Sequence, residues 1–260
     1  MTRAKQTAPT ILVTMAFIWL LQSCSATNHE VTIFAASSLA AATERLDAGI
    51  AEDDQVASAN WVLAGSSRLI AQVGDGARPD IIVSADAERL TELVEYGYLL
   101  LNEPRFSNRL VLAVSAGNPA QISSLNDLSL EKPLIGVCAP EVPCGAAANR
   151  VANEFSINIR GDTAEANVRA LAHKLANGEL DAGLVYVTDA ASLGLATVDD
   201  PRLATNDHCT DSNVITYGIA ALASAGTTST TRKANAQMLV ERYLLPEVLK
   251  EVGFAVEQCP

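Results

Sequence analysis

The sequence predicts an α/β fold built from mainly parallel sheets. Short runs of apolar and β-branched residues, each long enough for one buried strand, alternate along the chain with helix-periodic segments. Continuous apolar strands separated by helices are typical of parallel sheets that helices cover on both faces. Nearly half of the 260 residues are apolar, so the chain can bury a proper core as one large domain or two modest lobes.

The first strand run, Val31–Phe34, leads through two alanines and two serines, Ser37 and Ser38, into a helical pattern that begins at Leu39. Two hydroxyls therefore stand where a helix begins. A helix N-terminus carries unpaired N–H groups and a partial positive charge, so it attracts anions without a Lys or Arg side chain. Taken alone, the serine pair is more simply explained as a helix N-cap.

The same arrangement recurs at Gly65, Ser66 and Ser67, which lie between a strand run at 60–64 and a helical run at 69–73. Recurrence favours an anion site over two unrelated caps. The remaining expected strands are 80–84, 110–114, 132–137, 184–187 and 215–221, and the remaining expected helices are 85–98, 122–128, 147–155, 165–175 and 231–252.

The N-terminal segment predicts an export signal. Arg3 and Lys5 precede an apolar run at 11–21 that is too short to span a bilayer comfortably. The tetrapeptide Leu21–Cys24 follows and resembles the bacterial lipobox, in which the cysteine is lipidated and becomes the new N-terminus.

We therefore expect a signal peptide at 1–23 and a lipidated tether at 24–28 that anchors the mature protein to the membrane on the extracytoplasmic side. The alternative is an ordinary signal peptide cleaved near Ala26, which would discard Cys24.

Net charge limits the partners. At −12 the chain repels nucleic acid and anionic membranes in bulk, and an anionic ligand would have to be held by local dipoles. The chain has no G-x-S-x-G, HExxH or P-loop pattern, so we expect neither an enzyme nor a cofactor.

Four further cysteines, Cys138, Cys144, Cys209 and Cys259, suggest disulfides in an exported protein, with three possible pairings. One pairing closes a short loop from Cys138 to Cys144 and leaves Cys209 to join Cys259. A metal site is the weaker alternative, because the chain has no CxxC pair and its histidines lie near no paired ligand.

Several segments together resemble the molybdate-binding proteins of ABC transporters, which have the type II periplasmic-binding-protein fold. They occur in the family's order over essentially the whole mature chain. They are residues 31–39, 64–67, 79–86, 138–145, 167–169, 183–186 with Asp189, and 243–245 with 253–254.

The resemblance implies two α/β lobes, each a mainly parallel sheet flanked by helices, joined by a hinge of two crossovers. We expect lobe one at 29–108 plus 215–260 and lobe two at 109–214. The ligand would lie between the lobes, and the partner would be a membrane permease that receives it from a monomeric binding protein.

The resemblance also implies the ligand set. Lobe one would supply the hydroxyls of Ser38 and Ser66, with Ser67 as the alternative to Ser66. Lobe two would supply the backbone N–H groups of Cys144 and Val168. The fifth contact would be the hydroxyl of Tyr186, also from lobe two.

Molybdenum would be held only as its oxyanion, and tungstate should bind as well. Sulfate or another tetrahedral oxyanion is the alternative ligand. An exported hydrolase that uses Ser38 or Ser66 is a further alternative, but the matching segments contain no histidine partner.

Overall fold

The computed structural model describes residues 31–51, 58–102, 105–204, 207, 211–223 and 237–256. The expected signal peptide, the tether with Cys24, and both Cys209 and Cys259 lie outside the described residues. Within the described part of the chain, no helix is both long enough and apolar enough to cross a bilayer.

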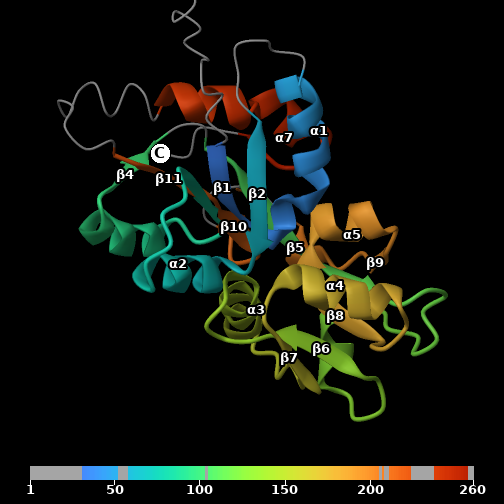
Figure 1. Ribbon diagram of the computed structural model, residues 1–260. Helices are drawn as coiled ribbons and strands as arrows, with labels where there is room; N and C mark the ends of the chain where they lie inside the picture. The colour runs from blue at the N-terminus through green and yellow to red at the C-terminus, as the bar shows by residue number, and fades with distance from the viewer. Residues whose placement is uncertain are drawn as a thin grey trace, which may run out of the picture.

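The first sheet has the strand order β2 (Ala59–Ala64), β1 (Val31–Ala36), β3 (Ile81–Ser84), β11 (Gly218–Leu222) and β4 (Tyr98–Leu101). β1 pairs in parallel with β2 and β3, whereas β11 is antiparallel to both β3 and β4. The flanking helices are α1 (Ala40–Ala51), α2 (Ser66–Gly74), the 3-10 helix η2 (Glu88–Tyr96), a helix at 237–243 and α7 (Pro246–Glu251) (Figure 1).

Strand periodicity explains why helices cover both faces of this sheet. On β1, Ile33 belongs to the cluster that contains Leu46 of α1. The next residue, Phe34, belongs to the cluster that contains Leu69 of α2 and Leu90 of η2. Because successive strand side chains point to opposite faces, a continuous apolar strand needs a helix layer on each side.

The second sheet has the order β10 (Val214–Thr216), β5 (Ser107–Val114), β8 (Ala182–Tyr186), β6 (Ile135–Cys138) and β7 (Thr163–Glu165), with β9 (Ala196–Val198) also paired to β5. Its helices are α3 (Pro143–Glu154), α4 (Val168–Ala176), α5 (Val187–Leu193), η3 (Leu125–Ser129) and η4 (Pro201–Leu203). We call each sheet with its helices a lobe, and Figure 1 shows the two lobes.

Both sheets are mixed, which corrects the expectation of mainly parallel sheets. In the second sheet, β6 is parallel to β7 and β8, but β5 is antiparallel to β8, β9 and β10. β5 and β11 are the strands by which the chain enters a sheet from the other lobe. A strand that enters a sheet in this way is not joined to its neighbour by a crossover helix, so it can pair with that neighbour in the antiparallel direction.

The chain passes between the lobes twice, after β4 and again at Tyr217, the residue between β10 and β11. β10 pairs with the first residues of β5, so strand pairing assigns Ser107, Asn108 and residues 215–216 to the second sheet. Each crossover therefore lies a few residues from its expected position.

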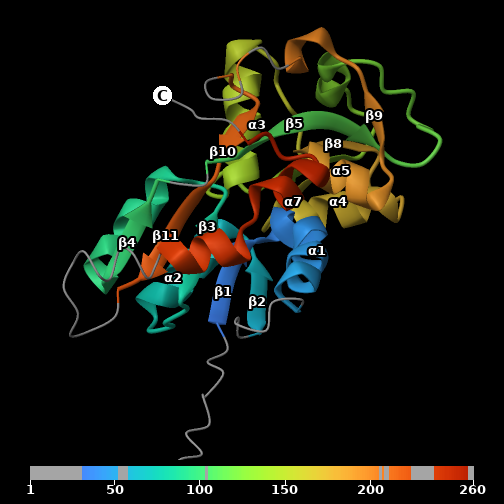
Figure 2. The same cartoon turned by 90° about the horizontal axis from the view of Figure 1, so that it is seen from above.

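An aromatic cluster joins the two crossovers. The rings of Phe106 and Tyr217 stack with centroids 4.6 Å apart, and Phe254 meets them edge-on at 5.5 and 5.4 Å. The N–H of Tyr217 donates to the Phe106 carbonyl at 3.0 Å. Figure 2 shows β10 beside β5, and β11 leading on from β10 into the first sheet. Close packing of buried rings here gives the hinge a defined position.

Asp189 is a buried carboxyl in the first turn of α5. Neither of its oxygens has a hydrogen-bond partner among the described residues, and a guanidinium nitrogen of Arg169 on α4 lies 3.7 Å from Oδ1. Burial raises the pKa of Asp189 from 3.8 to about 7, against the opposing effect of Arg169. The folded protein therefore favours the neutral acid at this position.

We predict that Asp189 makes folding stability fall with rising pH. The unfolded carboxyl loses its proton near pH 4, whereas the folded one keeps it to about pH 7. The folded state binds more protons in this interval, so the free energy of unfolding falls as pH rises through it. Asp189→Asn should flatten that slope in urea denaturation between pH 5 and pH 8.

Asp200→Asn is the matched control. Arg202 holds the pKa of the Asp200 carboxyl well below its usual value, so Asp200 does not titrate in this range. The control should lose stability but keep the wild-type slope. An Asp189→Asn slope equal to that of the wild type would contradict the prediction.

Candidate anion-binding site

A small cavity lies between the lobes, with a volume of about 10 Å³. The first lobe lines it with residues 36–38, Gly65, Ser66 and Ala85, and the second with residues 142–144, Asn167, Val168 and Tyr186. All five residues of the expected ligand set therefore lie at one cavity. None of the described residues that line it has a charged side chain.

Helix N-termini converge on this cavity. The 3-10 helix η1 (Ser37–Leu39), which leads into α1, begins there, and so do α2, α3 and α4. Tyr186 immediately precedes α5. The first N–H groups of each helix lack an intrahelical acceptor and carry partial positive charge, so their convergence favours a buried anion.

Ser38 and Ser66 face the cavity from the first lobe and are both buried. Ser66 Oγ accepts a hydrogen bond from the Ala85 N–H at 3.0 Å. Ser38 Oγ lies 2.5 Å from the hydroxyl oxygen of Tyr217, and either atom can be the donor. A hydroxyl that accepts one hydrogen bond still has its own proton to donate to a ligand.

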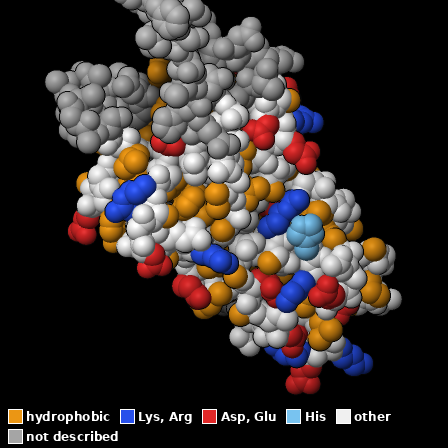
Figure 3. Space-filling model, in the orientation of Figure 1, with side chains coloured by type: hydrophobic (Ala, Val, Ile, Leu, Met, Phe, Trp, Pro, Cys, Tyr) orange, Lys and Arg blue, Asp and Glu red, His pale blue; other side chains and the backbone are white. Residues whose placement is uncertain are grey.

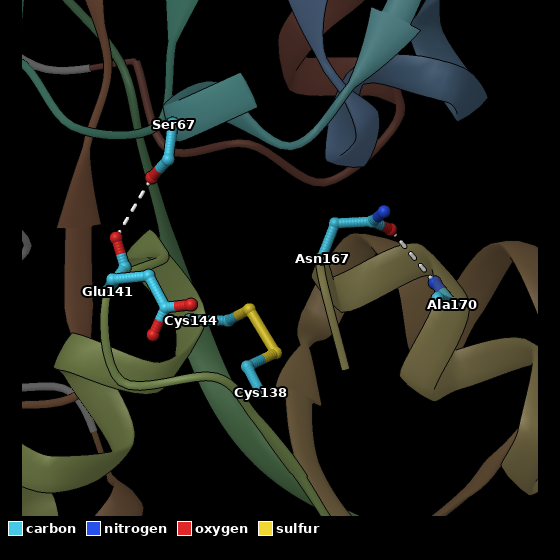
Figure 4. The surroundings of a disulfide bond; sticks show 6 residues. All are labelled: Ser67, Cys138, Glu141, Cys144, Asn167 and Ala170. Atoms are coloured by element: carbon cyan, nitrogen blue, oxygen red, sulfur yellow. Dashed lines mark hydrogen bonds between the residues drawn. A yellow bond between two sulfur atoms is a disulfide. The ribbon is translucent and has the colours of Figure 1, made fainter. Parts of the chain in front are cut away.

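The disulfide between Cys138 and Cys144 is present, with Cα atoms 5.8 Å apart, and it connects the end of β6 to the first turn of α3 (Figure 4). This confirms one of the possible pairings. A Cβ added at Gly145 would lie 2.0 Å from the Ala139 carbonyl oxygen, so only glycine lets α3 begin this close to β6. The Cys144 N–H is held in the first helical turn beside the cavity.

Val168 is the first residue of α4. The side chain of Asn167 caps this helix by accepting from the Ala170 N–H at 2.9 Å, a contact drawn in Figure 4. The cap uses the third N–H of the helix and leaves that of Val168 without an intrahelical acceptor.

Tyr186 gives the clearest indication of a ligand. Tyr186 lines the cavity, and its buried hydroxyl has no hydrogen-bond partner within the described part of the chain. Burial raises the pKa of Tyr186 well above its usual value, so the phenol remains a neutral donor. A buried hydroxyl left without a partner is costly, and an acceptor in the cavity would remove that cost.

Ser67, the register alternative, does not line the cavity. Its Oγ donates to the carbonyl oxygen of Glu141 in the second lobe at 2.9 Å, as Figure 4 shows. The same oxygen accepts from Arg89 at 2.9 Å. Beside it, a Cβ on Gly65 would lie 2.7 Å from the Ala166 carbonyl oxygen. The lobes are therefore in direct contact at Gly65 and at Ser67, the two residues on either side of Ser66.

A larger hollow of about 430 Å³ adjoins the site and shares Ala85 and Pro143 with it. Asp86, Glu88, Asp211 and Arg150 line this hollow. Mixed charges with three acidic groups make it a poor anion site compared with the smaller cavity. On the face shown in Figure 3, basic and acidic side chains are scattered and neither forms a continuous patch.

Tyr217 is the residue that sequence reasoning missed. The pattern 215–221 predicts one continuous strand, whereas the chain changes sheet at Tyr217 and directs its hydroxyl to Ser38. Local hydrophobic periodicity does not reveal a change of sheet within an apolar run. An aromatic residue between Thr216 and Gly218 was the available signal.

A known protein family matches most of the chain. The family model described as bacterial extracellular solute-binding protein matches residues 31–241. The chain is 34% identical over 166 residues to the molybdate-binding protein ModA of Mycobacterium tuberculosis, and the match spans 64% of each chain. It is 27% identical over 183 residues to the putative ABC transporter substrate-binding lipoprotein YvgL of Bacillus subtilis, covering 68% of this chain and 70% of that one.

Solved structures share the fold. The periplasmic molybdate-binding protein of Azotobacter vinelandii superposes with a TM-score of 0.68 at 18% identity, covering 88% of this chain and all of that one. The sulfate-binding protein SubI of M. tuberculosis gives 0.65 at 15% identity, covering 87% and 86%.

These likenesses confirm the two-lobed α/β fold of periplasmic binding proteins. The matching family model describes extracellular solute-binding proteins. The chain belongs to the bacterial extracellular solute-binding protein family.

Proposed function

We propose that the protein binds molybdate, and tungstate as well, outside the cytoplasm and delivers it to the permease of an ABC transporter. The observation that carries this proposal is the buried cavity at which neutral donors from both lobes converge, with the Tyr186 hydroxyl lacking a partner. The ligand set is Ser38, Ser66, Cys144, Val168 and Tyr186.

The donor set suits a tetrahedral dianion. Such an ion presents only acceptor oxygens, and hydroxyl and N–H groups present protons to it. Hydrogen bonds to an anion in a site shielded from water are strong even without a cationic side chain. A protonated oxyanion would bring a donor with no acceptor opposite it, so it should bind more weakly.

The same cavity links binding to closure. Ser38 and Ser66 belong to one lobe, and Cys144, Val168 and Tyr186 belong to the other. A ligand that contacts both sets gains its full interaction energy only in the closed form, and it therefore shifts the population to that form. The closed form would then present both lobes to the permease.

The relatives support molybdate and keep sulfate as the second candidate. The match to the M. tuberculosis molybdate-binding protein ModA covers slightly less than two thirds of that protein. A sulfate-binding protein also shares the fold. A serine hydrolase is disfavoured because none of the described cavity-lining residues is a histidine.

We further propose that Cys24 carries the lipid anchor and that the protein is a monomer.

Calorimetric titration with molybdate, tungstate, sulfate and phosphate tests the ligand. We expect molybdate and tungstate to bind with similar affinity, because their size and charge are nearly equal, and sulfate and phosphate to bind much more weakly. If sulfate alone binds tightly, the ligand is sulfate, the second candidate, and not molybdate. Absence of binding by all four would reject the proposed function.

Removing one donor should weaken binding without unfolding the protein. Ser38→Ala and Tyr186→Phe each leave a buried anion oxygen without a partner, which should cost about 1–3 kcal/mol of molybdate affinity, roughly 5–150-fold in Kd. The control is Tyr98→Phe, which removes a buried hydroxyl that donates to the Pro79 carbonyl at 2.8 Å. If both site variants bind as the wild type does, the site lies elsewhere.

Gly65→Ala tests closure. The added methyl would meet the Ala166 carbonyl oxygen of the other lobe at 2.7 Å, so the closed form becomes strained and molybdate should bind more weakly. Small-angle X-ray scattering should show a smaller ligand-induced compaction. Gly74→Ala, at the opposite end of α2, is the control, because its Cβ would make only ordinary contact with Tyr96 at 3.5 Å. Wild-type affinity and compaction in Gly65→Ala would contradict lobe closure at this contact.

A further inference from the structure

Tyr217 contacts the candidate site through Ser38, although it is not one of the residues that line the cavity. Its hydroxyl oxygen lies 2.5 Å from Ser38 Oγ, and both residues are buried. Its ring is held by stacking on Phe106 and by the edge of Phe254, and its N–H donates to the Phe106 carbonyl. The hydroxyl is thus positioned by packing and backbone contacts as well as by Ser38.

The direction of this hydrogen bond decides what Ser38 can offer a ligand. A serine hydroxyl has one proton. If Ser38 donates it to Tyr217, no proton is left for the cavity. If Tyr217 donates to Ser38 Oγ, the Ser38 proton is available to an acceptor in the cavity.

An oxyanion in the cavity favours donation by Tyr217, because it presents only acceptor oxygens and would take the Ser38 proton. Burial raises the pKa of Tyr217 above its usual value, so the phenol keeps its proton at physiological pH and can donate it. Ser66 offers a parallel, because its Oγ accepts from the Ala85 N–H and its proton is likewise available.

We propose that Tyr217 is a positioning residue that donates its hydroxyl proton to Ser38 Oγ and thereby directs the Ser38 proton to the bound oxyanion. The inference rests on the proposed oxyanion-binding function and adds a residue that does not line the cavity. Because Tyr217 also forms the second crossover, the donor geometry at Ser38 is tied to the position of the hinge.

A double-mutant cycle tests this. Molybdate Kd is measured by calorimetry for the wild type, Tyr217→Phe, Ser38→Ala, Ser66→Ala and the two double variants that combine Tyr217→Phe with each serine change. Phenylalanine keeps the ring stacking and removes only the hydroxyl. We expect Tyr217→Phe to weaken binding about 2–10-fold in the wild-type and Ser66→Ala backgrounds but to have almost no effect in Ser38→Ala.

A merely structural role gives a different result. Loss of packing or hinge support would weaken binding equally in all three backgrounds, and that outcome overturns the proposal, as does unchanged affinity in Tyr217→Phe. Tyr98→Phe controls for the loss of a buried phenol hydroxyl elsewhere. If the wild type binds no oxyanion, the proposed function fails and this inference fails with it.

Neutron diffraction from the deuterated wild-type protein with molybdate gives a second test that does not depend on the folding of any variant. The proposal expects the deuteron between the two hydroxyls to be bonded to the Tyr217 oxygen and the Ser38 deuteron to point to the ligand. A Ser38 deuteron directed at Tyr217 would overturn it.

Discussion

The structure depends on one electrostatic arrangement, the meeting of helix N-termini from two lobes at a cavity whose described lining carries no charged side chain. Partial charges on backbone N–H groups are permanent and need no counterion when the cavity is empty. A lysine or arginine in the same place would have to be desolvated or paired. Strands of both sheets end near this cavity, and helices that begin there follow them in the chain.

Glycine and disulfide contacts bring these helix ends together. Gly145 allows α3 to begin against the end of β6, and the Cys138–Cys144 bond holds it there. Gly65 allows α2 to approach the backbone of the opposite lobe. At the hinge, Phe106, Tyr217 and Phe254 pack both crossovers into one unit. Backbone proximity and ring packing, rather than ion pairs, set the geometry of the site.

Much of this was predictable from the sequence. The alternation of apolar runs and helical segments indicated the α/β fold, and the serine pairs marked two helix starts that do line one cavity. Antiparallel pairing of β5 and β11 was not predictable, because periodicity within a strand says nothing of its partner's direction. The contact from Ser67 to Glu141 and that from Tyr217 to Ser38 join residues far apart in the chain, and no local pattern reports them.

The short covalent loop at the start of α3 also ties ligand recognition to cell compartment. Thiols stay reduced in most bacterial cytoplasm and become oxidised outside it. A newly made chain would thus lack the Cys138–Cys144 disulfide until it has been exported. If the chain binds an oxyanion as proposed, copies that await secretion would hold the Cys144 N–H less firmly and should bind that ion more weakly than exported copies do.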